Sequence, residues 1–566
     1  IFVSKNGLGA AAVTHRAEKR YMGGMLVLSA STLISKVIGL LFKIPMMEII
    51  GIEGMAYFSS AYHIYILLLT LSTAGLPVAL SMMTAKSSAR GDRGEVGRIF
   101  GVSLSLLLPI GAVGTAVMYF GAKAFAAWIS IPDAEYAIKA ISPTLFFICA
   151  SSAVRGYFQG HEIMLPTAVS QLIESASKLA LGMGFALIAV RYGADPPHTA
   201  AAAICGLTVG VAGGAAYLAL RKMIFPRTKK YRGLYTAASM PRSGRLLAAE
   251  MISIALPVTV SASVTGIAGL ADTAIITSRL TAAGFDHSTA LALYSGYTNL
   301  AVPLYNLPTA LITPVAMSLV PALSAAVAAG EDKTAVSVLR TAFRVTFTAA
   351  LPAATGLAVF ALPVLRFIYP RQMSAVSVSA PLLSTLAPAV VFSCLITVTN
   401  AVLQAWGHPA LPIVSIGAGT AVKVVSEYLL VGTSVGIYGA PISTLLCGVT
   451  VVLLNFIFMY RYTPAQNGGI ISVSGIMRAL AASVVAVGAA GGVYIGLSRL
   501  GAGNAAALLA AIAVALPVYA IAALRSGAVG AEDIEALPGG ERAARLLGRA
   551  GLLRTFGMKK RKEMKK

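Results

Sequence analysis

Fourteen long apolar stretches, each near the length needed to cross a bilayer, constrain this chain more than any other feature of its sequence. They are bounded by glycine, proline or charged residues, and their length favours transmembrane helices over the shorter strands of a membrane barrel. A spanning helix also satisfies its own backbone hydrogen bonds. Only 11% of the 566 residues are charged, against roughly 25% in soluble proteins, which excludes a soluble enzyme and a nucleic-acid-binding domain. The sequence therefore predicts an all-α polytopic membrane protein with about fourteen transmembrane helices.

The basic residues predict how the chain is oriented in the membrane. If the N-terminus is cytoplasmic, 33 of the 44 lysines and arginines fall in cytoplasmic segments, seven fall in outer loops and four lie inside helices. Cytoplasmic loops of membrane proteins carry an excess of Lys and Arg, so both termini are predicted to be cytoplasmic. The tail 526–566 is basic and amphipathic, which predicts that it lies on the anionic inner leaflet.

An internal repeat divides the chain into two lobes. Two sets of three residues share the same spacings of 16 and 19, and the segments PVALSMM (77–83) and PVAMSLV (314–320) are similar. The first set is Pro143, Gln159 and Lys178, and the second is Pro388, Gln404 and Lys423. Both copies begin on the cytoplasmic side, so the repeat is parallel, as in transporters whose substrate site lies between two lobes near the membrane midplane. We expect two parallel six-helix lobes plus two added C-terminal helices.

These boundaries predict six segments. They are a cytoplasmic N-tail (1–21), an N-lobe with spans 1–6 (22–220), a cytoplasmic basic linker (221–247), a C-lobe with spans 7–12 (248–460), spans 13–14 (471–525) and a basic cytoplasmic C-tail (526–566). The sequence holds no nucleotide-hydrolysis loop of the form GxxxxGK[ST] and no HExxH motif, and no GxSxG motif or pair of catalytic carboxylates occurs at a plausible spacing. We therefore expect no enzyme, and uphill movement of a substrate would need an ion gradient or the membrane potential.

Charged residues inside the predicted spans are the main candidates for function, because each costs about 2.5 to 3.5 kcal/mol at the bilayer centre. Ser29, Lys36 and Lys43 are spaced by seven residues on span 1 and therefore share one helix face. We expect this face to bind an anionic group such as a diphosphate. The alternative is that Lys43 reaches outward to the head groups, toward Glu48, while Lys36 forms a buried pair.

Five further ionisable residues within the spans are candidates for ion coupling or buried pairing. They are Glu174, Lys178, Asp272, Lys423 and Glu427. Glu174 and Lys178 are spaced i,i+4, as are Lys423 and Glu427, so the two members of each pair can neutralise each other on one helix. Asp272 has no such neighbour, so it is the candidate for coupling to Na+ or H+, and its pairing with Lys423 is the alternative. We expect Arg155 and His63 near helix ends, where water is within reach.

Three long runs of this sequence resemble one known family. They are STLISKVIGLLFKIPMMEIIGIEGMAYFSSAYHIYILLLTLSTAGLPVALS (31–81), LYSGYTNLAVPLYNLPTALITPVAMSLVPALSAA (293–326) and KVVSEYLLVGTSVGIYGAPIST (423–444). They resemble the opening, the eighth span and spans 11 and 12 of the stage V sporulation protein B and lipid II flippase group. This group belongs to the multidrug/oligosaccharidyl-lipid/polysaccharide (MOP) exporter superfamily.

The resemblance implies a V-shaped MATE-like fold, export of an undecaprenyl-diphosphate-linked saccharide, and a groove for the lipid tail at spans 13 and 14. Lys36 and Lys43 match basic positions of the family's first span. Leu69 and Pro303 stand where Gram-negative members look to have arginine, so this cavity is expected to be less basic. Some members bind sodium through an aspartate that Asp272 matches, and Lys423 departs from such a site.

These observations together predict a flippase for a lipid II-like precursor or a related polysaccharide intermediate, in cell-wall, spore-cortex or polysaccharide biosynthesis. We expect a monomer in the bacterial plasma membrane that contacts anionic lipids and no nucleic acid, with no cofactor unless Na+ or H+ is the coupling ion. A drug/cation antiporter of the same superfamily is the first alternative, although its cavity should be acidic and aromatic. A membrane-embedded glycosyl transferase or ligase is the second, although the outer loops are short for a catalytic domain.

Overall fold

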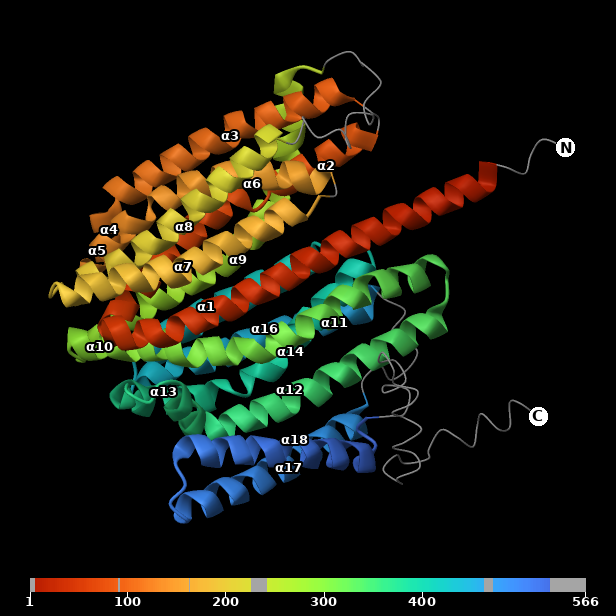
Figure 1. The fold of residues 1–566 in the computed structure, drawn as a ribbon. Coiled ribbons are helices and arrows are strands. Elements are labelled where there is room, and N and C mark those ends of the chain that lie inside the picture. Colours follow the sequence, from red (N-terminus) through yellow and green to blue (C-terminus); the bar gives the residue numbers. More distant parts are fainter. Residues whose placement is uncertain (1–5, 90–91, 162, 225–241, 463–471, 530–566) are drawn as a thin grey trace, which may run out of the picture. The chain divides into compact units, whose positions relative to one another are not determined.

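A computed structural model describes residues 6–89, 92–161, 163–224, 242–462 and 472–529, and the described chain is almost entirely helical (Figure 1). The helices up to residue 282 are α1 (Asn6–Thr73), α2 (Leu76–Ala89), α3 (Arg93–Phe120), α4 (Ala122–Trp128), η1 (Pro132–Ala134), α5 (Glu135–Ile141), α6 (Pro143–Gly160), α7 (Leu165–Arg191), α8 (Pro196–Ile224) and α9 (Gly244–Ala282). Those that follow are α10 (His287–Ser295), η4 (Gly296–Ala301), α11 (Val302–Ala328), α12 (Asp332–Ile368), α13 (Met373–Leu386), α14 (Ala389–Ala405), α15 (Leu411–Val431), η5 (Gly436–Tyr438), α16 (Gly439–Tyr462), α17 (Val473–Arg499) and α18 (Asn504–Ser526). This confirms the predicted all-α fold.

The longest helix, α1, is a hairpin that reverses at Gly51. Gly51 has φ 70° and ψ −177°, a backbone conformation that is essentially restricted to glycine. Sixteen residues of continuous helix would separate Phe42 from Phe58 by about 24 Å, but their ring centroids are 5.7 Å apart. The two arms of α1 therefore run antiparallel and belong to two successive spans of the predicted N-lobe.

The described helices account for the predicted number of membrane crossings. Twelve stretches are long and apolar enough to span a membrane, or thirteen when α13 and α14, which meet at 51°, count as one broken span. One of these stretches, Leu41–Ser88, contains the reversal at Gly51 and so holds parts of two crossings. When Leu41–Ser88 is counted as two crossings and α13 with α14 as one, the described part of the chain is consistent with fourteen crossings.

The chain forms two compact units, Ile1–Ser278 (unit 1) and Arg279–Lys566 (unit 2). This boundary lies one helix later than the predicted linker at 221–247, of which 225–241 fall outside the described residues. The reason is that α9 packs on unit 1: Leu247 and Met251 share a buried cluster with Leu80 of α2, and the Gly75 N–H donates to Thr259 Oγ1 at 3.2 Å.

The repeated residues occupy equivalent places in the two units. Pro143 begins α6 directly after α5, and Pro388 is the N-cap of α14 directly after α13, so each proline marks a break within one crossing. Proline suits the first position of a helix because it lacks the N–H that would have no partner there. Lys178 and Lys423 lie in the middle of the following long helices, α7 and α15.

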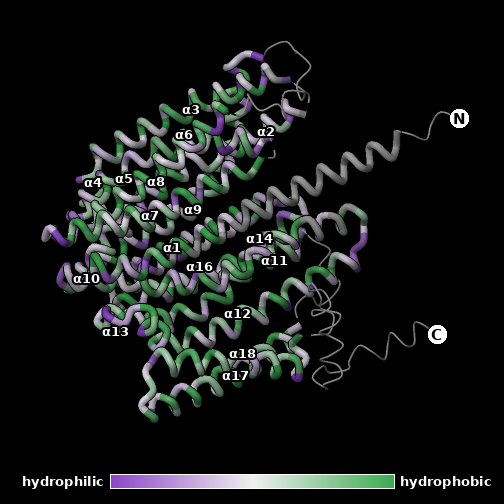
Figure 2. The backbone as a smooth tube through the Cα atoms, in the orientation of Figure 1, coloured by the Kyte–Doolittle hydropathy of each residue, from purple (hydrophilic) through white to green (hydrophobic). Residues whose placement is uncertain are grey.

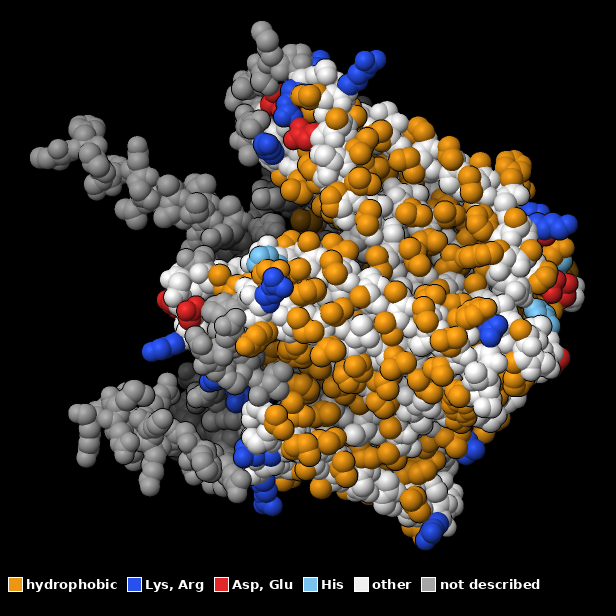
Figure 3. All heavy atoms as spheres, turned by 180° about the vertical axis from the view of Figure 1, so that it is seen from behind, with side chains coloured by type: hydrophobic (Ala, Val, Ile, Leu, Met, Phe, Trp, Pro, Cys, Tyr) orange, Lys and Arg blue, Asp and Glu red, His pale blue; other side chains and the backbone are white. Residues whose placement is uncertain are grey.

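Hydrophobic residues dominate the lengths of the helices, and hydrophilic ones gather near the helix ends and connections (Figure 2). On the face shown in Figure 3, hydrophobic side chains cover much of the surface, and Lys, Arg, Asp and Glu side chains lie mainly toward its margins. A soluble protein does not expose so many apolar side chains, so these helices present a surface suited to lipid.

Candidate functional site

A polar cavity of about 420 Å³ lies inside unit 1. Both arms of the α1 hairpin line it together with α6, α7 and α8. Its polar lining consists of Thr32, Ser35, Tyr62, Tyr65, Arg155, Gln171, Glu174, Ser175 and Lys178, and its other lining residues include Phe42, Ile66 and Leu69. We name this space the N-unit cavity. It brings two basic groups and one carboxylate to a single space among apolar spans.

Lys178 is held at the N-unit cavity by aromatic rings. Its Nζ lies 4.9 Å from the Phe42 centroid, 5.6 Å from that of Phe58 and 4.9 Å from that of Tyr62. Each ring face attracts a cation by about 0.5 to 2 kcal/mol. None of the ion pairs between described residues involves Lys178, and Lys43 adds a like charge that repels it. The rings stabilise the ammonium group without neutralising it, so the cavity keeps a positive charge.

Glu174 pairs with Arg155 of α6, not with Lys178 one turn away on α7. The Arg155 Nε also donates to Ser170 Oγ at 3.1 Å, which orients the guanidinium toward α7. Both partners are about 85% buried (14% and 15% exposed), and a guanidinium binds a carboxylate through a rigid donor fork that an ammonium group lacks. The sequence prediction of an i,i+4 pair is therefore wrong for Glu174, and Arg155, expected near a helix end, is part of the site.

Glycines on α8 allow α7 to approach closely and so set the position of Glu174. A Cβ on Gly214 would lie 2.9 Å from Glu174 Oε1, and one on Gly206 would lie 2.2 Å from the Gly182 nitrogen. Small residues at such interfaces allow backbones to approach closely within a membrane. The glycines of α8 therefore let α7 and α8 pack closely at Glu174 and Gly182.

Comparisons with known proteins assign the chain to a family. Residues 22–327 match the family described as "Polysaccharide biosynthesis protein". That match covers more than half of the chain. The chain belongs to the polysaccharide biosynthesis protein family.

Two proteins of Bacillus subtilis (strain 168) are similar to this chain in sequence. "Lipid II flippase MurJ" is 25% identical over 465 residues, which are 79% of this chain and 83% of that protein. "Stage V sporulation protein B" is 26% identical over 450 residues, which are 79% of this chain and 85% of that protein. These names confirm the resemblance drawn from the sequence.

Solved structures show the fold of this family member. A structure of lipid II flippase MurJ in an inward closed conformation has a TM-score of 0.64 at 14% identity and covers 88% of this chain and 98% of its own. An inward-facing MATE family transporter of the MOP superfamily has a TM-score of 0.62 at 16% identity, and the match covers 78% of this chain and 99% of that transporter. The chain is thus a multi-pass membrane protein with a MATE-like fold.

The structure places the residues predicted on span 1 along the first arm of α1. The side chains of Ser29 and Lys36 lie outside the described side chains, so their role stays a prediction. Lys43 is half-buried, one residue beyond Phe42. Ser31, which the sequence did not single out, donates to Ala168 O at 3.0 Å and fixes this arm against α7.

The other predicted ionisable residues lie on α9 and α15. Lys423 and Glu427 are buried one turn apart on α15 of unit 2, and Lys423 interacts electrostatically with Tyr305 of α11. Asp272 is on α9 in unit 1, next to Thr273, whose Oγ1 lies 2.8 Å from His63 Nδ1. The proposals that Asp272 couples to Na+ or H+, or pairs with Lys423, stay predictions.

A double-mutant cycle tests the Arg155–Glu174 pair. Glu174→Met or Arg155→Met alone should lower the free energy of unfolding by about 1 to 3 kcal/mol, because each leaves a buried charge without its partner. The combined change Arg155→Met/Glu174→Met should recover most of that loss. Denaturant unfolding in detergent measures all of these variants. Glu135→Gln, which breaks the more exposed Glu135–Lys139 pair (25% and 40% exposed), is the control and should change less. Strictly additive losses would contradict the pairing.

Proposed function

We propose that this protein is a flippase that moves an undecaprenyl-diphosphate-linked saccharide across the bacterial plasma membrane by alternating access. The substrate would be a lipid II-like peptidoglycan precursor or a related polysaccharide intermediate. The observation that carries this proposal is the surplus positive charge of the N-unit cavity, where Lys178 faces only rings and the one lining carboxylate is paired with Arg155.

An anionic group would complete the electrostatics of this cavity. Attraction between Lys178 and a diphosphate acts in a low-dielectric space, where charges interact more strongly than in water. Hydroxyl and amide groups from Ser35, Gln171 and Ser175 lie on the same lining and can hydrogen-bond a saccharide. Lys36 is on the same arm of α1 by sequence and would add a second cation.

The drug/cation antiporter is disfavoured by the same geometry. An organic cation would need an available carboxylate or an open aromatic face. Glu174 is engaged by Arg155, and the rings of Phe42, Phe58 and Tyr62 already face an ammonium group. A second cation in this cavity would meet repulsion from Lys178.

An apolar groove in unit 2 suits the lipid tail of such a substrate. It has a volume of about 400 Å³. Residues that face it come from α12 (between Pro352 and Val364), α17 (between Ala486 and Ala490) and α18 (between Leu508 and Tyr519). The only polar side-chain group of this lining, the Tyr519 hydroxyl, donates to Thr348 O at 2.6 Å. A polyprenyl chain gains about 0.8 kcal/mol per CH₂ that stays out of water, so a groove on the outer helices lets the tail remain in an apolar setting.

Rescue of a bacterium depleted of its lipid II flippase tests the function. The wild-type gene should restore growth, and Lys178→Met should reduce transport by at least about tenfold, since a charged hydrogen bond is worth about 1.5 to 3 kcal/mol. Lys178→Arg should retain much of the activity because the charge is kept. Lys139→Met, the same change at an exposed site, is the control. Full rescue by Lys178→Met at equal expression would refute the role of the cavity.

Filling the groove tests its role in binding the tail. Gly356 lines the groove, and no atom lies within 4 Å of a Cβ at this position. Gly356→Leu should therefore place its side chain in the groove and slow transport several-fold for a full-length polyprenyl substrate. It should have little effect on an analogue with a short chain. Gly488→Leu on α17, also in open space but off the lining, is the matched control. Equal effects of the two variants would exclude the groove as the tail site.

A further inference from the structure

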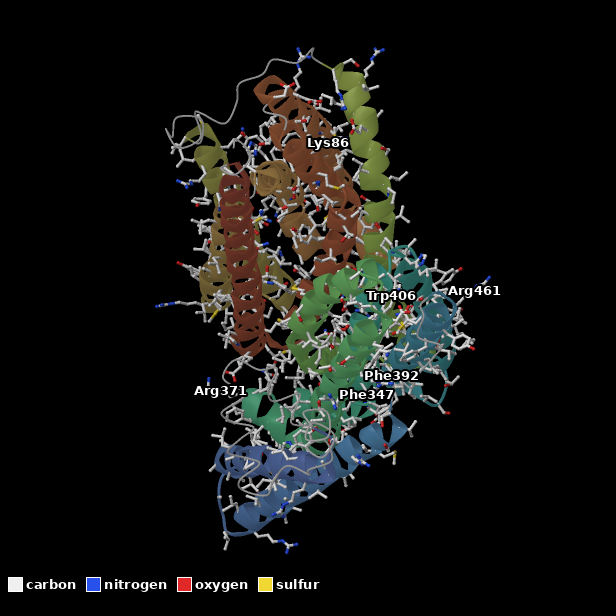
Figure 4. All side chains as sticks on the ribbon, turned by 90° about the vertical axis from the view of Figure 1, so that its right-hand side faces the viewer. Lys86, Phe347, Arg371, Phe392, Trp406 and Arg461 are labelled. Carbon is white, nitrogen blue, oxygen red and sulfur yellow. The ribbon has the colours of Figure 1, made fainter. Side chains whose placement is uncertain are left out.

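A second cavity in unit 2 has the character of a phosphate site. It has a volume of about 290 Å³ and lies between α12 and the start of α17. Arg340 and Arg344, one turn apart on α12, line one side, and Ser472 and Gly475 line the other. The rings of Phe343 and Phe347 also line it, together with Thr348, Ile476, Ala479 and Ala528; Figure 4 labels Phe347. We name this space the arginine cavity.

The length of α12 predicts that the arginine cavity lies toward one surface of the membrane. Helix α12 runs for 37 residues with a kink at Phe360, and about 20 residues suffice to cross a hydrocarbon core, so its first turns are predicted to project toward the lipid head groups. Arg340 and Arg344 are two to three turns from its start, and Ser472 is the N-cap of α17. The basic residues predict that this end of the helices is cytoplasmic, where the anionic lipids of the inner leaflet are found.

Two independent features of the arginine cavity favour an anionic phosphate. A guanidinium matches a phosphate with two parallel N–H donors, and here two guanidinium groups line one space. The N-terminus of α17, a helix of 27 residues, opens on the same space, and its first N–H groups carry a partial positive charge. Its cap, Ser472 Oγ, accepts from the Gly475 N–H at 3.1 Å, which holds this end in place.

The arginine cavity is separate from the apolar groove assigned to the lipid tail. The two spaces share no lining residue. Leu351 is buried in a cluster with Ala479 and Ala482, and the Tyr519 hydroxyl of the groove donates to the Thr348 carbonyl oxygen of the arginine cavity. The smaller cavity fits a phosphate ester, whereas a diphosphate that carries a disaccharide is much bulkier. Its Phe343 and Phe347 rings offer an apolar bed for the first carbons of a lipid.

We propose that the arginine cavity binds the phosphodiester head group of an inner-leaflet anionic phospholipid, held by Arg340, Arg344 and the N-terminus of α17. This lipid would join α12 to α17 at the membrane surface. The site does not depend on the transported substrate, so it stands or falls apart from the proposed function.

Binding of phosphatidylglycerol to the purified full-length protein tests this site. Native mass spectrometry should detect phosphatidylglycerol retained on the wild type in preference to phosphatidylcholine. The variant Arg340→Gln/Arg344→Gln should bind it at least about tenfold more weakly. The control Lys333→Gln/Arg461→Gln removes the same charge from exposed positions off the cavity lining, and Figure 4 shows Arg461 apart from Phe347; its binding should equal that of the wild type.

Further variants keep the test decisive if the double variant does not fold. Arg344→Lys keeps the charge but loses the fork, so it should weaken binding by an intermediate amount, and Arg340→Gln alone should weaken it as well. Equal loss in both double variants would show that only general charge matters and would overturn the site. Full displacement of phosphatidylglycerol by glycerol phosphate would show that no lipid is required, and stronger binding of undecaprenyl phosphate would assign the cavity to the substrate. Either result would also overturn the proposal.

Discussion

The requirement that charges within a membrane protein be compensated governs the arrangement of unit 1. Removing an ammonium group from water is costly, and Lys178 meets this cost through three ring faces instead of a carboxylate. Those rings come from both arms of the α1 hairpin. The reversal at Gly51, the position of α7 and the charge of the cavity are therefore parts of one arrangement. If α1 were straight, Phe42 could not contact Lys178 at the same time as Phe58 and Tyr62.

The Arg155–Glu174 pair has a complementary role. It keeps the lining carboxylate from neutralising Lys178, and the Gly206 and Gly214 contacts hold α7 at the distance from α8 that this geometry needs. Leu69 lies on the same lining, at a place where the family resemblance implies arginine in some members. In this chain the cation is supplied by α7, so a cavity with fewer arginines remains positively charged.

Much of the fold could be predicted from the sequence because apolar length and helix-breaking residues act locally. The segment predicted to hold spans 13 and 14 (471–525) corresponds to α17 and α18, which together run from Val473 to Ser526, and the repeat placed Pro143 and Pro388 at equivalent breaks. The partners of charged residues were harder to predict, because Glu174 prefers a guanidinium from another helix over a lysine on its own. The π-helical turn Gly296–Ala301 was also missed. The place of such a turn within a helix depends on tertiary packing, here on the close approach of Gly296 to Ser379.

Photo-crosslinking inside the N-unit cavity tests the central claim most directly. A photoreactive phenylalanine in place of Ile66, on the cavity lining, would be compared with one in place of Val113, which is 62% exposed on α3. The protein would be reconstituted with a radiolabelled undecaprenyl-diphosphate disaccharide. The account predicts labelling at position 66 only, removed by excess unlabelled substrate and not by undecaprenol. Equal labelling at both positions, or displacement by undecaprenol alone, would contradict a cavity that binds the anionic head group.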